Sequence, residues 1–232
     1  MTSKTALVTG ANRGIGLEVA RQLEERQFTV WLAVRNTDSG EQATASQKKG
    51  GITSRFVLMD VANPSSINQA FAMMSKEVAT LDVLVNNAGI LLDESVSVLE
   101  VSQKAVYDTL NTNALSALFV TQTFLPLLKK GSRIINVSSG AGEICRDMSS
   151  YAPIYSVSKT TMNAISCQLA SALRSKGVSI NAVCPGWVRT EMGGMVAPRS
   201  VKRGADTIIW LALDAPADET GRFWRDRKTI SW

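Results

Sequence analysis

Short apolar runs alternate with amphipathic stretches along the whole chain. Thr5–Thr9 and Phe28–Val34 are almost wholly apolar, as in strands that are buried on both faces of a sheet. Between them, Ile15, Val19 and Leu23 recur every four residues and share one face of a helix. This alternation of strand and helix predicts a parallel sheet covered by helices on both faces.

The same pattern continues to the last residues. Further strands are expected at Ile52–Met59, Leu81–Val85, Arg133–Val137, Val178–Val183 and Gly221–Trp224, and further helices at Asp38–Lys49, Pro64–Val78, Val98–Leu110, Asn113–Leu128, about Pro153 to Lys176, and Arg199–Leu213. No repeat or linker divides the sequence. We therefore expect residues 1–232 to form a single α/β domain, a doubly wound Rossmann-type parallel sheet of about seven strands.

Composition and charge exclude several classes of protein. The 232 residues are 45% hydrophobic and 19% charged, as in ordinary globular proteins. Histidine is absent, which excludes Ser-His-Asp hydrolysis and histidine-ligated metals, so no metal site is expected. The net charge of +5 comes from scattered residues, and no apolar run approaches the roughly 18 residues of a membrane span. We expect neither a nucleic acid nor a membrane as partner.

The three cysteines are far apart in the sequence and odd in number. Cys145, Cys167 and Cys184 form neither a CxxC pair nor a disulfide framework. Cys167 and Cys184 stand in apolar surroundings and are expected to be small core residues. This cysteine usage predicts a cytoplasmic protein.

A glycine-rich turn separates the first strand from the first helix. Its sequence from Thr9 to Gly16 has the spacing G-x-x-x-G-x-G, formed by Gly10, Gly14 and Gly16. Such a turn lets a backbone approach a pyrophosphate closely, and the N–H groups of the following helix face the negative charge. The position of the turn predicts a dinucleotide site.

The residue after the second strand distinguishes two cofactors. An acidic side chain there would accept a hydrogen bond from the ribose 2′-hydroxyl of NADH, but this chain has Arg35, and Arg13 lies in the glycine turn. Two guanidinium groups suit a 2′-phosphate, so we predict NADPH/NADP+ over NADH. Asp38 lies nearby and weakens this preference, and the alternative is that Arg35 is a solvated loop residue.

Seven motifs in order resemble the classical short-chain dehydrogenase/reductase family. They are Thr9–Gly16, Asp60-Val61, Asn86-Asn87-Ala88-Gly89, Asn113, Ser138-Ser139, Tyr155-x-x-x-Lys159 and Pro185-Gly186. The stretch from Pro185 to Thr190 and the final Trp232 are most similar to NADPH-dependent carbonyl reductases. The resemblance implies reversible reduction of aldehydes and ketones to alcohols by hydride transfer.

The resemblance also implies which residues contact the cofactor. Asp60 and Val61 would meet the adenine, Val188 and Thr190 the nicotinamide carboxamide, and Lys159 the ribose hydroxyls. The full implied set is Gly10, Asn12, Arg13, Gly14, Ile15, Arg35, Asp60, Val61, Asn87, Ala88, Gly89, Tyr155, Lys159, Pro185, Gly186, Val188 and Thr190.

The candidate catalytic residues are Asn113, Ser139, Tyr155 and Lys159. Tyr155 and Lys159 are four residues apart on an expected helix and share a face, so the ammonium is expected to lower the pKa of the tyrosine and make it a general acid. Ser139 would bind the substrate oxygen, and Ser138 is its rival, set aside because the family motif uses the second serine. By the same resemblance, Asn113 would hold a water that links Lys159 to solvent.

The loop after Thr190 and the segment before Tyr155 bear on the substrate pocket and on the oligomeric state. Few residues lie between Thr190 and the last helix, which predicts an open pocket that accepts bulky carbonyls, with Tyr151, Trp187 and Met192 facing the substrate alongside Ser139. Trp187 could instead pack in the core, where Trp210 is expected. The long insertion before the tyrosine that accompanies monomeric carbonyl reductases is missing, which favours a homo-oligomer. A narrow ketoacyl, steroid or sugar carbonyl substrate, or a non-catalytic NADP(H)-sensing regulator, are the alternatives.

Overall fold

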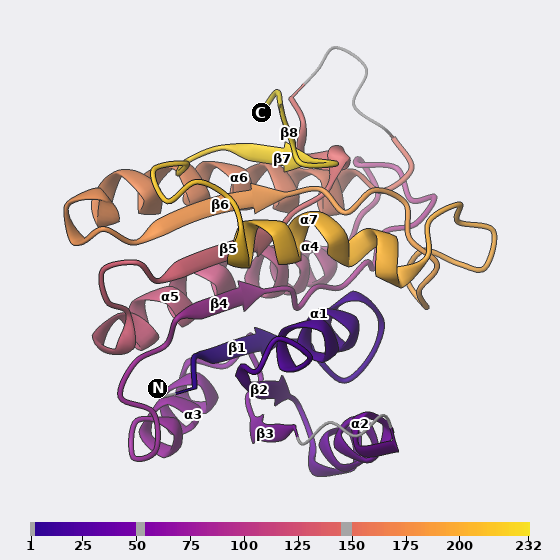
Figure 1. Cartoon of the computed structure of the whole chain (residues 1–232). Helices are drawn as coiled ribbons and strands as arrows, with labels where there is room; N and C mark the ends of the chain where they lie inside the picture. The colour runs from indigo at the N-terminus through magenta and orange to yellow at the C-terminus, as the bar shows by residue number, and fades with distance from the viewer. Residues whose placement is uncertain (1–2, 50–53, 145–149) are drawn as a thin grey trace.

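The computed structural model describes residues 3–49, 54–144 and 150–232, and this part of the chain is built around an eight-stranded sheet (Figure 1). The strand order is β3-β2-β1-β4-β5-β6-β7-β8. Every neighbouring pair is parallel except β7 with β8. The strands are β1 (Thr5–Thr9), β2 (Thr29–Val34), β3 (Arg55–Leu58), β4 (Val83–Asn86), β5 (Arg133–Val137), β6 (Ser179–Val183), β7 (Phe223–Arg225) and β8 (Lys228–Ile230).

Helices cover both faces of the sheet, as the sequence predicts (Figure 1). They are α1 (Gly14–Glu24), α2 (Thr37–Lys49), α3 (Pro64–Met74), α4 (Gln103–Leu110), α5 (Ser116–Phe124), α6 (Pro153–Leu173) and α7 (Val201–Leu213). One core lies between the sheet and α1, α2 and α7, and the other lies between the sheet and α3, α5 and α6. Strand β1 shows why both faces are apolar: Ala6 and Val8 belong to the first core and Leu7 to the second, and all three are fully buried.

The sheet grows in two directions from β1. The chain first adds β2 and β3 on one side, then crosses over to place β4 on the other side of β1. A crevice opens at such a switch point, beyond the carboxyl ends of the two central strands. The glycine turn after β1 and the Asn87–Gly89 segment after β4 both lie there.

The structure corrects several predicted elements. The sequence missed β8, a three-residue edge strand whose side chains are mostly exposed and which therefore carries no apolar pattern. The helix predicted at Val98–Leu110 begins at Gln103, because the Ser102 hydroxyl caps it by accepting the Ala105 N–H at 3.2 Å. The helix predicted at Asn113–Leu128 is a π-helical turn, η1 (Asn111–Leu115), followed by α5 and a short 3-10 turn containing Pro126.

Candidate active site

The glycine turn packs tightly against the segment that follows β4. A Cβ at Gly10, whose φ is +61°, would lie 2.9 Å from Ala88 Cα, and one at Gly16 would lie 2.5 Å from Asn87 Nδ2. The Asn87 amide donates to the carbonyls of Thr9 (2.9 Å) and Gly10 (3.2 Å). The Thr9 hydroxyl accepts the N–H groups of Asn87 and Ala88, a role that sequence reasoning missed. Asn87 therefore shapes the turn with its side chain.

The start of α1 has the features of an anion site. Its N-cap residue is Arg13, whose side chain caps none of the helical N–H groups within the described structure. Gly14 has φ +56°, and a Cβ there would lie 3.3 Å from Thr190 Cγ2, so the loop after β6 closes the far side of the crevice. Open N–H groups at a helix start next to a backbone without side chains fit a dinucleotide pyrophosphate.

Arg13 makes an ion pair with Glu191 across the mouth of this crevice. Both side chains are largely exposed, at 61% and 69%. Glu191 was not singled out from the sequence, because nothing in its local pattern shows that it faces a residue on α1. Arg13 can contact a phosphate only by sharing or leaving this partner.

The residues predicted around the adenosine lie at the carboxyl ends of β2 and β3. Arg35 is exposed, and among the described residues it has neither a hydrogen bond nor an ion pair. Val61 is buried at 6% exposure, and the Asp60 carboxylate accepts the N–H of Ala62 at 3.0 Å within its own turn. Arg35 is free to bind a 2′-phosphate, and this role stays a prediction.

Tyr155 and Lys159 lie on α6, as the sequence predicts, and Ser139 completes the group. Ser139 follows β5 and is hydrogen-bonded to the Tyr155 hydroxyl. The Ser138 side chain turns away: it is 2% exposed and donates to the Lys159 carbonyl at 3.3 Å. The pleat of the strand thus brings the second serine, and not the first, to the tyrosine.

Lys159 is buried beside Tyr155. Its Nζ donates to the Val137 carbonyl at 2.8 Å and lies 5.6 Å from the centroid of the Tyr155 ring. Burial lowers the pKa of Lys159 to about 8, and the neighbouring Cys184 opposes that shift. At neutral pH most Lys159 side chains still carry a charge.

The expectation that Lys159 lowers the pKa of Tyr155 is wrong in this structure. Burial raises the pKa of Tyr155, Cys184 raises it further, and only the hydrogen bond from Ser139 acts in the lowering direction. The reason is that the half-buried phenol loses the hydration that a phenolate needs, while the Lys159 ammonium is directed to a backbone carbonyl. The Tyr155 hydroxyl therefore stays protonated through the neutral range.

Asn113 lies in the π-helical turn η1 and is fully buried. Its side chain accepts the Ile90 N–H at 2.7 Å and donates to the Ile90 carbonyl (2.8 Å) and the Ser158 hydroxyl (3.0 Å). A Cβ at Gly89 would lie 3.3 Å from Asn113 Oδ1 and 3.7 Å from Lys159 Nζ. Gly89 thus keeps side-chain atoms out of the space between Asn113 and Lys159. The predicted role of Asn113 in binding a water stays a prediction.

Asp93 anchors the start of α6, and sequence reasoning missed it. Its carboxylate is 1% exposed and accepts the N–H groups of Ile154 (2.5 Å) and Tyr155 (3.3 Å). The helix has Ala152 at its own N-cap position, which offers no side-chain acceptor, so an aspartate 61 residues away caps it. No local signal marks such a contact.

The predicted substrate-facing side chains lie at the surface. Tyr151, Trp187 and Met192 are 54%, 56% and 41% exposed. Trp187 donates its Nε1–H to the Gly193 carbonyl at 2.7 Å, so the alternative that it packs in the core is wrong. The Tyr151 hydroxyl donates to Glu94 at 3.1 Å, and that bond raises the pKa of Tyr151. That these side chains face a substrate in an open pocket stays a prediction.

The loop after β6 presents its residues unequally. Val188 is buried, with its side chain against Gly204 of α7, so its backbone is what remains for a cofactor contact. The Thr190 hydroxyl accepts the Gly193 N–H at 3.0 Å. Gly186 has φ +78°, and a Cβ there would lie 2.5 Å from the Arg199 side chain.

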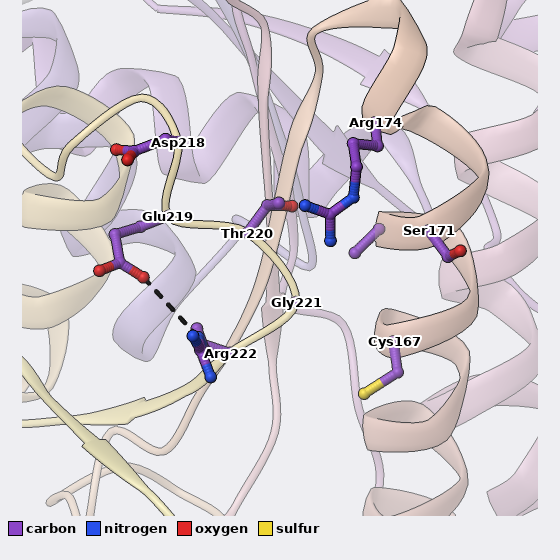
Figure 2. A pocket seen from close by; sticks show the side chains of 9 residues that line it. Cys167, Ser171, Arg174, Asp218, Glu219, Thr220, Gly221 and Arg222 are labelled. Atoms are coloured by element: carbon purple, nitrogen blue, oxygen red, sulfur yellow. Dashed lines mark ion pairs between the residues drawn. The ribbon is translucent and has the colours of Figure 1, made fainter.

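Two hollows lie outside this group. A groove of about 780 Å³ runs between residues 95–98 and the first turn of α6, and Tyr151, Val98 and Val157 line it. A pocket of about 330 Å³ lies between the C-terminal half of α6 and residues 218–222, which precede β7 (Figure 2). Cys167 lines this second pocket and is half-buried, so it is not the core residue expected, whereas Cys184 is buried as predicted. Cys145 lies outside the described residues.

The described residues contain no cluster of histidine, cysteine or carboxylate side chains that could hold a metal ion. Among the helices of the described ranges, none is both long enough and apolar enough to cross a membrane.

Comparison with known proteins gives one consistent result. The family model described as short chain dehydrogenase matches residues 4–200. The chain is 33% identical to NADPH carbonyl reductase 1 of Mus musculus, over 98% of both proteins. It is 31% identical to a short-chain dehydrogenase of Penicillium roqueforti, over 99% of this chain and 97% of that one. A crystal structure of NADPH-bound carbonyl reductase from chicken fatty liver superposes with a TM-score of 0.88, at 28% identity and full coverage of both chains.

Proposed function

This chain belongs to the short-chain dehydrogenase family, and we propose that it is an NADPH-dependent enzyme that reversibly reduces aldehyde and ketone carbonyls to alcohols. The observation that carries the proposal is that Ser139, Tyr155 and Lys159 lie together at the carboxyl ends of the parallel strands, the same side of the sheet as the glycine turn. Residues 1–232 would work as one NAD(P)-binding domain. The relatives named for NADPH carbonyl reduction match the chain over nearly its whole length.

Different residues of the crevice would bind different parts of the cofactor. The open N–H groups of α1 and the bare backbone at Gly10 and Gly14 suit the pyrophosphate. Arg13 and Arg35 would bind the 2′-phosphate of NADPH. The remaining members of the proposed set are Asn12, Ile15, Asp60, Val61, Asn87, Ala88, Gly89, Tyr155, Lys159, Pro185, Gly186, Val188 and Thr190. When bound, NADPH supplies the hydride that the substrate carbonyl carbon accepts.

Tyr155 would donate its hydroxyl proton to the carbonyl oxygen as the carbon accepts the hydride. The raised pKa of Tyr155 suits this direction, because the group that must supply a proton is protonated at neutral pH. The Ser139 hydroxyl is hydrogen-bonded to Tyr155 and would bind the same substrate oxygen, stabilising its developing charge. Lys159 would bind the ribose hydroxyls. A water held near Asn113 would link Lys159 to solvent, so that a proton from solvent can return toward Tyr155.

The exposed side chains of Tyr151, Trp187 and Met192 support broad acceptance of bulky carbonyl substrates. The test is loss of NADPH absorbance, against NADH, over aldehydes, α-diketones, β-ketoesters and quinones. Turnover with NADPH on several bulky carbonyls is the expected result. NADPH binding without turnover on any of them would favour a narrow substrate or a sensing role instead.

We also infer a homo-oligomer and a cytoplasmic location. The alignment with the mouse relative extends over 273 positions, more than the 232 residues of this chain, so the relative carries residues that this chain lacks. This is in line with the expectation that the chain lacks the insertion found in monomeric carbonyl reductases, which is our first reason to infer an oligomer. Tyr107, Leu115 and Val157, on or beside α4, α5 and α6, are exposed apolar side chains of the kind that contact a second copy. The free thiols of Cys167 and Cys184 suit a reducing compartment. Light scattering at the assay concentration tests the assembly, and a monomer would contradict it.

A further inference from the structure

The residues Ser139–Glu143, here called the serine turn, present the catalytic serine candidate. Gly140–Gly142 form a single 3-10 turn, η3, and Ser139 is its N-cap residue, with Oγ accepting the Ala141 N–H at 3.2 Å. The turn ends where the Glu143 N–H donates to the Gly140 carbonyl at 3.1 Å. One short turn has few bonds of its own, so the position of Ser139 depends on what holds the turn from outside.

Helix α6 holds one side of the serine turn. Thr160 Oγ1 and Asn163 Nδ2 both donate to the Gly142 carbonyl at 3.2 Å. A Cβ at Gly142 would lie 2.8 Å from the backbone carbonyl carbon of Lys159, so the turn rests directly on the helix. This side fixes the turn to the element that carries Tyr155.

Arg225, at the end of β7, holds the other side. Its Nη2 donates to Glu143 Oε1 at 2.5 Å, and its Nε donates to Cys184 Sγ at 3.3 Å. The same sulfur accepts the Gly140 N–H at 3.1 Å, so one acceptor joins the arginine to the residue next to Ser139. A Cβ at Gly140 would lie 2.4 Å from Arg225 Nη2, so a larger residue there would displace the end of the arginine side chain. The Arg225–Glu143 ion pair is about two-thirds buried, which protects it from the screening that weakens surface pairs.

We propose that Arg225 is a positioning residue, which clamps the serine turn against α6 and thereby sets the hydrogen bond between Ser139 and Tyr155. The fork of a guanidinium reaches two acceptors at fixed angles, which a lysine ammonium does not. The inference rests on the proposed function, since Ser139 and Tyr155 are the groups that would meet the substrate. It extends the site to the end of β7, 86 residues beyond Ser139 in the numbering.

The kinetic test compares Arg225→Ala, Arg225→Lys and Arg222→Ala. Arg222 is the matched control, because it carries the same charge but lies at the amino end of β7, whereas Arg225 lies at the carboxyl end. It pairs there with Glu219. Direct loss of an oxyanion donor lowers kcat by about 10²–10³-fold, and a displaced donor should cost less, so we expect a loss of about tenfold for Arg225→Ala. The KM for NADPH should stay within about twofold, Arg225→Lys should lie between, and Arg222→Ala should match the wild type.

A spectroscopic test needs no turnover. The chain has three tyrosines, so Tyr107→Phe with Tyr151→Phe leaves Tyr155 as the only one, and its ¹³Cζ resonance reports the hydrogen bond to its hydroxyl. Arg225→Ala should move that resonance in the same direction as Ser139→Ala does, and Arg222→Ala should leave it in place. If Arg225→Ala does not fold, Glu143→Gln removes the ion pair with the arginine retained and should give the same shift.

The outcomes separate the two proposals. A resonance that moves in a protein without carbonyl turnover supports the clamp and overturns the proposed function. Turnover together with an unmoved resonance and unchanged kcat in both Arg225→Ala and Glu143→Gln overturns the clamp. Equal losses in Arg222→Ala and Arg225→Ala also overturn it, because they would show a general effect of charge or stability.

Discussion

Replacing Asp93 by alanine should weaken both the fold and the catalytic step. The carboxylate is almost completely buried and accepts two N–H groups at the start of α6, those of Ile154 and Tyr155. One of these donors is the backbone of the proposed proton donor itself. The substitution removes the one oxygen, Oδ2, that accepts both bonds and leaves two amides without partners where water has little access.

The structure gives the size of the effect. Loss of a helix N-cap costs about 0.5–2 kcal/mol, and a buried donor left unsatisfied costs about 1–3 kcal/mol. The charge of the carboxylate next to a helix N-terminus adds a few tenths. We therefore expect Asp93→Ala to lower the free energy of unfolding by about 2–3 kcal/mol, which is roughly 5–10 °C in Tm for a chain of this size. Asp93→Asn keeps one acceptor oxygen and should cost about 1 kcal/mol.

Asn63→Ala is the matched control for this experiment. Asn63 caps α3 with the same number of bonds, accepting the N–H groups of Ser65 (2.9 Å) and Ser66 (3.3 Å). These N–H groups lie at an exposed helix end, so water replaces the lost acceptor and the cost should be about 1 kcal/mol.

Differential scanning calorimetry and steady-state kinetics together decide the outcome. Displacement of a catalytic group by about 1 Å can cost about 10²-fold, so Asp93→Ala should lose at least about tenfold in kcat while Asn63→Ala retains it. An Asp93→Ala protein with unchanged Tm would refute the claim that Asp93 stabilises the fold by capping α6. A protein that is destabilised as expected but keeps full kcat would refute the link from the cap to Tyr155.

Four further predictions follow from the site. Tyr155→Phe should abolish carbonyl reduction, because it removes the hydroxyl that donates the proton. The Kd for NADPH, measured by fluorescence titration, should stay within about twofold of the wild-type value. Wild-type turnover in this variant would contradict the mechanism. Arg35→Asp should move the ratio of kcat/KM for NADPH and NADH toward NADH, and an unchanged ratio would remove the cofactor argument. Glu191→Gln should lower the Kd for NADPH by up to about fivefold, because it frees Arg13 from an exposed ion pair worth about 1 kcal/mol at most; equal or weaker binding would show that the pair does not compete. Lys159 has a folded pKa of about 8 against an ordinary 10.5, so between these values the unfolded chain binds a proton that the folded chain does not. Stability should therefore rise with pH across that window by up to roughly 3 kcal/mol relative to Lys159→Met in urea denaturation, and parallel pH curves would refute the burial effect.

Local sequence patterns were sufficient for most of the fold. Buried parallel strands are apolar throughout, so β1 and β2 could be predicted almost to the residue. Helices have one apolar face, so the buried face of α1 could be identified from Ile15, Val19 and Leu23. The edge strand Lys228–Ile230 could not, because it pairs along one side only and its mostly exposed side chains carry no pattern. The start of α4 shifted by five residues because Ser102, a cap within the predicted helix, stops it from extending toward Val98.

What the sequence by itself determined about this protein is the set of residues whose spacing is local: the glycine turn after β1, the four-residue step from Tyr155 to Lys159, and the two arginines near the expected phosphate. Tertiary structure gave the physical reason why Ser139, which the family resemblance had already favoured, and not Ser138 meets Tyr155. Tertiary structure alone decided that Asp93 and Arg225 hold the elements on either side. It also reversed the expected shift of the Tyr155 pKa. The physical reason is common to all of these. Backbone periodicity is a property of neighbours in sequence, whereas desolvation and long-range hydrogen bonds depend on which distant segments cover a group once the chain has folded.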